Sequence, residues 1–252
     1  PRAPFAARGI AVVNALDIQP FALAIGALTD AVSGTVGLSA SFEGRLNEPA
    51  TLRAFVNLQD VALSVGGLPV ALERPARITI GTDDFTVDDL ALAVGQSAFT
   101  ASGRFIDTST APLRAAFSGE LADVVALGRS FGAVPAVEAS GRLTATWESR
   151  GGIAKAQSTA SLSNASIAMA GYPAVEALQA TAGFDGTTLT LEALSATWQG
   201  GAIDARARLP RRLFEPDAGV APTSPSNGRV DVTISGLTEQ ALVPWLPAAT
   251  IA

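Results

Sequence analysis

The sequence has no cysteine, no histidine and, among its 17 basic residues, a single lysine, Lys155. Without cysteine and histidine, the chain has neither a thiolate nucleophile nor the ligands of a Cys/His zinc site. Histidine is also the side chain that most often acts as a general acid or base. Catalysis would have to depend on carboxylates, so we expect a protein that is not an enzyme and that uses no cofactor and no metal.

Charge of either sign is also scarce. Charged residues make up 16% of the chain, hydrophobic residues 48%, and the formal net charge is −6 at pH 7. A chain of this composition lacks the basic surface with which proteins displace counterions from nucleic acid. It has enough apolar residues to bury, which is not typical of a disordered chain. No apolar run approaches 18 residues, so we expect no membrane span within the sequence.

An internal repeat is the strongest pattern in the sequence. Residues between Leu58 and Arg104 recur, without a gap, at a spacing of 104, the distance from Leu58 to Leu162. A third copy begins near Val230, after a segment rich in Pro, Ser and Gly that indicates a surface loop at residues 211–227. We therefore expect two complete units and the start of a third. Their boundaries are residues 1–110, 111–227 and 228–252.

Each unit is expected to consist mainly of strands. Apolar residues alternate with small or polar ones, which indicates half-buried strands. The apolar set changes from odd to even positions between Val87 and Leu90, and again between Leu191 and Leu194. A one-residue slip would send the apolar set to the other face, so the pattern predicts a bulge or tight turn at both places.

One short helix is expected to punctuate each unit. Apolar residues at near-helical spacing predict helices near residues 20–28 and 120–128. A third candidate contains Leu237, Leu242 and Trp245, in the unit that begins at residue 228. Pro20 and Pro244 restrict the first and third helices, because proline disrupts a helix interior.

The repeat resembles those of the AsmA-like superfamily, and among its members most closely those of TamB-type translocation and assembly module proteins. The resemblance rests on residues 56–63, 85–92 and 97–105, read VNLQDVAL, FTVDDLAL and SAFTASGRF, and on their partners 104 residues later. It implies a mainly β fold: an elongated, curled, taco-like sheet of tandem repeats, each with one short helix. Such a sheet would have an open apolar groove.

The same resemblance implies a function between two membranes. The protein would lie in the periplasm, anchored to the inner membrane by an N-terminal helix outside this sequence. It would bind phospholipid or other acyl lipids in the groove and support outer-membrane biogenesis. An outer-membrane β-barrel protein would be a further partner, contacted through regions outside this sequence.

The apolar positions of the alternating strands are the expected lining of the groove. A face of Ala, Val, Leu and Phe without charge suits acyl chains, since each buried CH₂ group is worth about 0.8 kcal/mol. The expected lining residues are Leu38, Phe42, Leu63, Val65, Ile80, Phe85, Val87, Leu92, Val94, Phe99, Phe105, Phe117, Trp147, Ile167, Met169, Phe184, Leu189, Leu191, Trp198, Ile203, Val232 and Ile234.

The same alternation is compatible with a different function. If the apolar face packs against a second sheet, the chain is a structural β-repeat spacer or an adhesive scaffold with a packed core and no ligand. Two facing sheets would favour this alternative, and an uncovered apolar face would favour the lipid groove. An enzyme is the third alternative and would need two opposed carboxylates, such as those of Glu120 and Glu138.

The densest group of carboxylates comprises Asp83, Asp84, Asp88 and Asp89. Calcium sites need six to eight oxygen ligands in a defined loop. The second unit has no carboxylate pair at the positions equivalent to Asp83 and Asp84, so the cluster is not part of the repeat. We interpret it as a solvated turn.

Overall fold

The computed structural model describes residues 6–20, 31–45, 47–82, 85–105, 111–132, 135–150, 155–211 and 228–238. The expectation of a mainly β protein is confirmed, because these residues form fourteen strands and a helix, α2 (Leu121–Ser130). The strands are β1 (Ala6–Asp17), β2 (Val32–Arg45), β3 (Glu48–Val65), β4 (Leu68–Leu72), β5 (Ala76–Gly81), β6 (Phe85–Val94), β7 (Ser97–Arg104), β8 (Leu113–Glu120), β9 (Val137–Ser149), β10 (Ala156–Met169), β11 (Tyr172–Phe184), β12 (Thr188–Trp198), β13 (Gly201–Pro210) and β14 (Arg229–Ser235).

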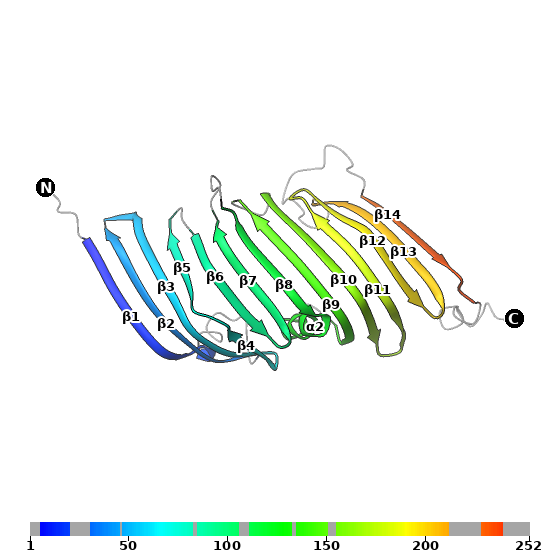
Figure 1. Ribbon diagram of the computed structural model, residues 1–252, viewed down its shortest axis with the longest axis horizontal. Coiled ribbons are helices and arrows are strands. Elements are labelled where there is room, and N and C mark those ends of the chain that lie inside the picture. The colour runs from blue at the N-terminus through cyan, green and yellow to red at the C-terminus, as the bar shows by residue number, and fades with distance from the viewer. Residues whose placement is uncertain are drawn as a thin grey trace.

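All the strands belong to one 14-stranded sheet whose order follows the chain, with one exception (Figure 1). β4 and β5 both lie between β3 and β6 and share one position in the sheet. Pro75 stands between them. Because proline has no backbone N–H to donate, it interrupts a ladder that would otherwise continue.

Neighbouring strands alternate in direction, so the sheet has two long edges formed by strand ends. We call the edge where β1 begins and β2 ends the upper edge, and the opposite one the lower edge (Figure 1). At the upper edge lie the ends of β2, β5, β7, β9, β11 and β13. α2 follows directly after β8 and lies at the lower edge.

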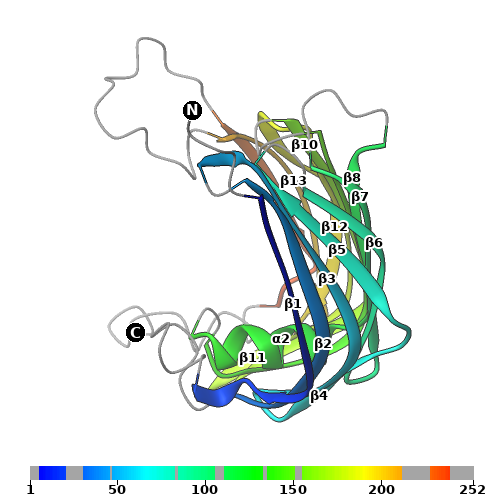
Figure 2. The ribbon, with the colours of Figure 1, turned by 90° about the vertical axis from the view of Figure 1, so that its left-hand side faces the viewer.

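The sheet is strongly curved, and α2 lies on its concave side (Figure 2). Bulges contribute to such curvature because each adds a residue to one strand and bends it. The register shifts between Val87 and Leu90 in β6, and between Leu191 and Leu194 in β12. Both bulges predicted from the change of parity are therefore confirmed. Each keeps the apolar residues before and after it on the same face.

The helix expected near residues 120–128 is present as α2. An acidic residue, Asp123, lies in its first turn and a basic one, Arg129, in its last turn. This arrangement complements the helix dipole. The helix expected near residues 20–28 falls almost entirely on residues 21–30 and lies outside the described residues. The same holds for Leu242 and Trp245 of the third candidate helix.

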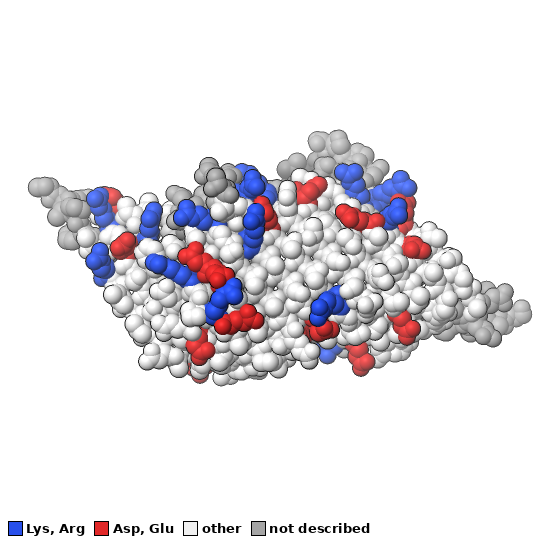
Figure 3. All heavy atoms as spheres, in the orientation of Figure 1, with Lys and Arg blue, Asp and Glu red and all other residues white. Residues whose placement is uncertain are grey.

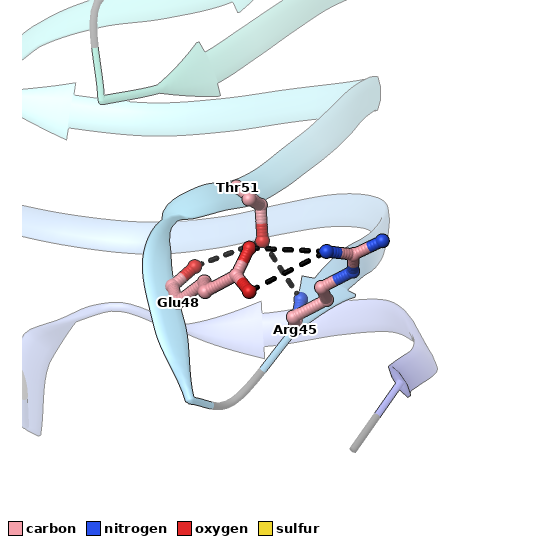
Figure 4. A network of polar contacts seen from close by, with 3 residues as sticks. All are labelled: Arg45, Glu48 and Thr51. Carbon is pink, nitrogen blue, oxygen red and sulfur yellow. Dashed lines mark hydrogen bonds and ion pairs between the residues drawn. The ribbon is translucent and has the colours of Figure 1, made fainter. Parts of the chain in front are cut away.

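The connection between β2 and β3 at the upper edge is held by side chains (Figure 4). The Thr51 hydroxyl accepts a hydrogen bond from the backbone N–H of Arg45 at 2.9 Å and donates one to the carbonyl of Glu48 at 2.8 Å. The Arg45 guanidinium pairs with the Glu48 carboxylate at 3.2 Å. These contacts satisfy backbone groups that the turn removes from the ladder.

Two glycines with positive φ allow a test of how tightly the sheet is packed. At Gly141 (φ +110°) an added Cβ would lie 2.4 Å from the Cα of Ala165, whereas at Gly171 (φ +82°) it would meet no atom within 4 Å. Gly171→Ala should lower the free energy of unfolding by about 1 kcal/mol through backbone strain alone. Gly141→Ala should lower it by about 3 kcal/mol, because overpacking is added. Equal losses in urea unfolding would show that the β9–β10 contact relaxes freely.

Candidate functional site

The apolar side chains of the strands share one face of the sheet. Directly opposite residues of an antiparallel pair project to the same face, so the register traces rows of side chains across the strands. One row runs from β6 to β14 and is apolar throughout. It comprises Leu92, Phe99, Phe117, Ala145, Ala160, Ala182, Leu191, Ala207 and Val230.

Neighbouring rows on this face have the same character. The row nearer the lower edge comprises Leu143, Leu162, Ala180, Leu194, Ala205 and Val232. The row nearer the upper edge comprises Ala115, Trp147, Ser158, Phe184, Leu189 and Leu209. A row in the first strands comprises Ala11, Ala40, Val56, Ile78 and Val87. None of these rows contains a charged residue.

The position of α2 shows whether the apolar rows lie on the concave or the convex side of the sheet. α2 lies on the concave side (Figure 2), and its Leu121 packs against the buried cluster of Ala165, Leu178 and Ala196. Leu162 and Leu194, which belong to the rows above, pack against the same cluster. The apolar rows therefore face the concave side, and we call this surface the concave face.

The structure places all the expected lining residues on the concave face, although they are spread over its whole length. Phe42, Ile80 and Phe85 lie near the upper edge in the first strands. Phe105 follows the end of β7 and stacks on Trp147, with ring centroids 6.4 Å apart. The concave face is therefore one continuous apolar surface, and the expected lining residues do not gather in one localised pocket.

The concave face is largely uncovered. Phe42 is 46% exposed to solvent and Ile80 is 45% exposed, although both side chains point toward the concave side. On the last strand, Val232 and Ile234 are more than half exposed. The described residues form a single sheet, and no second sheet faces it. Within the described part of the chain, α2 is the helix that rests on this face.

Sequence reasoning missed some residues of this face. Leu143, Leu162 and Leu194 were not among the expected lining residues, although the register places them there. The repeat contained the signal, because Leu162 and Leu194 are the counterparts of Leu58 and Leu90 at a spacing of 104.

A buried polar contact attaches α2 to the sheet and was also missed. Asp123 is 8% exposed and Ser97 only 4%. Oδ2 of Asp123 accepts hydrogen bonds from the Ser97 hydroxyl at 2.7 Å and from the backbone N–H of Gln96 at 2.9 Å. The Ser97 oxygen in turn accepts one from the N–H of Glu120 at 3.0 Å. The start of α2 is thereby fixed to the turn between β6 and β7.

The convex side has the opposite character, with charged residues distributed over it and toward the upper edge (Figure 3). Cross-strand polar contacts occur here, such as Arg114 with Glu148 at 2.9 Å and Thr146 with Thr159 at 2.7 Å. A shallow depression of about 730 Å³ lies around Gly183. Its hydroxyl and charged groups bond to one another across strands, which is typical of a solvated sheet surface.

The carboxylates considered for an enzyme lie on this polar surface. Glu120 is 4.0 Å from Arg142 of β9, directly opposite it in the ladder. Glu138 lies near the start of the same strand, opposite Ala168. Both residues project from the same side of neighbouring strands, so their carboxylates do not face each other across a cleft.

The carboxylate cluster of the first unit divides between two environments. Asp88 lies within β6 opposite Arg77, and Asp89, at the bulge, pairs with Arg74 at 2.5 Å. Asp83 and Asp84 lie outside the described residues. In the part of the chain that the structure describes, no group of three or more acidic residues could hold a metal ion.

Among the described residues, no helix has the length and hydropathy needed to cross a membrane.

Comparisons of the chain with models of protein families, with curated proteins and with solved structures found no match. The function must therefore be inferred from the chemistry of the two faces of the sheet.

The contact between Asp123 and Ser97 predicts a measurable coupling. Asp123→Ala or Ser97→Ala should each lower the free energy of unfolding by about 2 kcal/mol, because buried hydrogen-bond partners are left unsatisfied. The loss of unfolding free energy in the double variant, measured by urea unfolding, should be smaller than the sum of the two single losses by about 0.5 kcal/mol or more. Asp123→Asn keeps an acceptor and should lose less than Asp123→Ala. If the two single losses add up to the loss of the double variant, the contact between Asp123 and Ser97 does not attach α2 to the sheet.

Proposed function

We propose that this chain is a periplasmic segment of an AsmA-like, TamB-type lipid-conduit protein. Its concave face would bind the acyl chains of phospholipids as they pass between the inner and outer membranes, in support of outer-membrane biogenesis. The observation behind this proposal is the uncovered, charge-free apolar face that crosses the sheet. Large exposed apolar patches on proteins mark sites of interaction.

The strand boundaries support the tandem repeat on which the resemblance rests. β3 ends at Val65 and β10 at Met169, and β7 begins at Ser97 and β13 at Gly201. Both spacings equal the 104 residues of the sequence repeat. The turns that follow β3 and β10 contain Gly67 (φ +84°) and Gly171 (φ +82°). We propose that each unit adds one block of strands to a continuous conduit.

The dimensions of the sheet suit acyl chains. Neighbouring strands lie about 4.8 Å apart, so a sheet of this many strands is about 60 Å long. This is about twice the thickness of the hydrocarbon core of a bilayer. More than one lipid could therefore lie on the concave face. Each CH₂ group transferred from water would contribute about 0.8 kcal/mol, with no need for a specific polar contact.

α2 gives further support. Leu121 packs against the sheet, and Val124, Val125 and Leu127 are only partly buried. A helix that is apolar around most of its circumference is typical of an apolar environment. We propose that its partly exposed side chains border the acyl chains. A bound lipid would then touch apolar groups of the sheet and of α2.

Lipid should co-purify with this chain when it is isolated without detergent, because contact between water and the apolar side chains of the concave face is unfavourable and bound lipid removes it. Native mass spectrometry should detect complexes heavier than the chain by the mass of one or more phospholipids. Delipidated protein should bind added phospholipid again. A chain that neither retains nor takes up lipid would favour a structural spacer or adhesive scaffold.

A charge on the concave face should weaken lipid binding. Phe99→Glu and Ile203→Glu should each reduce bound lipid several-fold, because an ionised carboxylate is costly to place against acyl chains. Thr100→Glu and Ala202→Glu are matched controls, since these neighbours are exposed on the convex side. They should bind lipid normally. Equal retention by all four variants, with unchanged circular dichroism, would exclude the concave face as the binding surface.

The same substitutions apply to transport. In the full-length protein, Phe99→Glu and Ile203→Glu should impair lipid transfer between the membranes, whereas Thr100→Glu should not. The readout would be the phospholipid content of the outer membrane in cells whose only copy is the variant. Normal transfer by Phe99→Glu would show that this part of the concave face is not in the lipid path.

A further inference from the structure

The first strand of the sheet has one side without a described partner. β1 pairs with β2, and among the described strands none pairs with the other side of β1. Such an edge presents a row of N–H and C=O groups to any extended chain that can pair with it. Charged residues and proline commonly protect edge strands from pairing. The middle of β1 contains neither, since residues 9–13 read GIAVV.

The middle of β1 is apolar on both faces. Ala11 belongs to the rows of the concave face, and successive side chains of a strand alternate, so Ile10 and Val12 project to the convex side. Ile10 is 77% exposed and Val12 is 63% exposed, the two highest values among the large apolar side chains that the structure describes. A continuous apolar run is typical of a strand that is buried on both faces.

The repeat shows that the apolar convex side is specific to β1. β1 and β8 are equivalent strands at the spacing of 104, and β8 has Arg114 and Ala116 at the positions of Ile10 and Val12. β14, the first strand of the third unit and the strand at the other end of the sheet, has an aspartate and a threonine there. The architecture of the unit does not require Ile10 and Val12, so we attribute them to a contact of β1 itself.

A second copy of β1 complements this edge. When two copies pair antiparallel about a two-fold axis at Ala11, Ile10 of each copy lies opposite Val12 of the other on the convex side. On the concave side, Ala11 lies opposite Ala11, and Gly9 lies opposite Val13. Directly opposite side chains project to the same face and pack against each other. Every pair formed by residues 9–13 is then free of polar side chains.

Other registers fit less well. A shift by two residues in one direction sets Ile10 opposite Asn14, and a shift in the other direction sets Val12 opposite Arg8. A shift by one residue would turn the concave face of one copy to the convex side of the other. The register centred on Ala11 sets Arg8 opposite Asn14, so no two like charges face each other.

Phe42 of β2 adds to the apolar surface on the concave side of this edge. Its ring lies over Gly9, because a Cβ added to Gly9 would collide with Cε1 of Phe42. An aromatic ring that covers a glycine of the neighbouring strand helps to fix the register at a sheet edge. Val13 of the second copy lies opposite Gly9 in the proposed register, where it extends the contact with this ring.

Two other kinds of strand complement the edge less well. In the second unit, the neighbour of β8 on the equivalent side is β7, which has Thr100 and Ser102 on the convex side. A strand of that kind would set hydroxyl groups beside Ile10 and Val12. β14 of a second copy would set Asp231 there, and it would run parallel to β1 with the concave faces on the same side. Of these three strands, only β1 offers apolar residues at both positions.

We infer that this chain pairs with a second copy of itself through β1, in the register centred on Ala11. The two-fold axis is perpendicular to the sheet, so the concave faces of the two copies lie on the same side and form one apolar surface. The inference goes beyond the proposed function, because the pairing needs no lipid. A ladder this short buries less than the about 1,200 Å² of a stable interface, so we expect a dissociation constant in the micromolar range.

Sedimentation equilibrium of the delipidated chain tests the pairing. The chain should pass from monomer to dimer as its concentration rises through the micromolar range. Ile10→Arg/Val12→Ala gives β1 the convex residues of β8 and should weaken the dimer about ten-fold or more, because two apolar cross-strand pairs are lost. Both side chains are exposed, so circular dichroism should show an unchanged fold. Thr233→Arg on β14 is the matched control and should dimerise like the wild type.

Single cysteines test the register, since the chain has no cysteine of its own. In the paired copies the two Ala11 Cα atoms lie about 4.5 to 5.5 Å apart, within the range of a disulfide. Ala11→Cys should therefore form a cross-linked dimer on mild oxidation. Val13→Cys is the matched control on the same face of β1, because its two Cα atoms lie about 14 Å apart. It should cross-link several-fold less.

The outcomes separate this inference from the proposed function. A chain that stays monomeric up to near-millimolar concentration would overturn a second copy as the occupant of the edge and point to a strand of another kind. A dimer that Ile10→Arg/Val12→Ala retains, or equal cross-linking of the two cysteine variants, would show another surface or register and would also overturn the inference. Lipid binding by a monomer would leave the proposed function intact. A dimer through β1 that binds no lipid would overturn the proposed function alone.

Discussion

The register between neighbouring strands is the constraint on which the rest of the structure depends. The side-chain period of a strand is two, so a slip of one residue would exchange the two faces. In this sheet, one slip between any two neighbouring strands from β7 to β10 would interrupt the row that joins Phe99 and Phe117 to Ala145 and Ala160. Every bulge in the described strands must therefore be matched to a change of parity in the sequence.

This dependence explains what could be predicted from the sequence. The change of parity between Val87 and Leu90 predicted a bulge, because only an extra residue keeps the apolar residues of one strand on one face. The helical spacing after Glu120 predicted α2. Both signals are local: each is contained in a few consecutive residues and does not depend on what packs against them.

The parts that could not be predicted depend on distant groups. The bond between Asp123 and Ser97 joins residues of two elements, and neither residue shows its partner in the sequence. Whether the apolar face is covered is also invisible, since strands of a packed sandwich alternate in the same way as those of a single sheet. The division between β4 and β5 had a local signal in Pro75, which the repeat obscured because the second unit has Gln179 at that position.

The relative sizes of side chains on the concave face connect the fold to the proposed function. Ala145, Ala160 and Ala182 are consecutive in one row, over three neighbouring strands. The row above them contains Trp147 and Phe184, and the row below contains Leu143 and Leu162. Each flanking row also has one small residue on these strands, Ser158 above and Ala180 below, and the three alanines between these rows leave a low strip about 15 Å long, since strands are spaced about 4.8 Å apart. A face evolved only to pack against another sheet gains from interlocking large and small residues within each row. A strip of uniform low height across several strands instead fits a flexible, rod-like ligand, and an acyl chain has that shape.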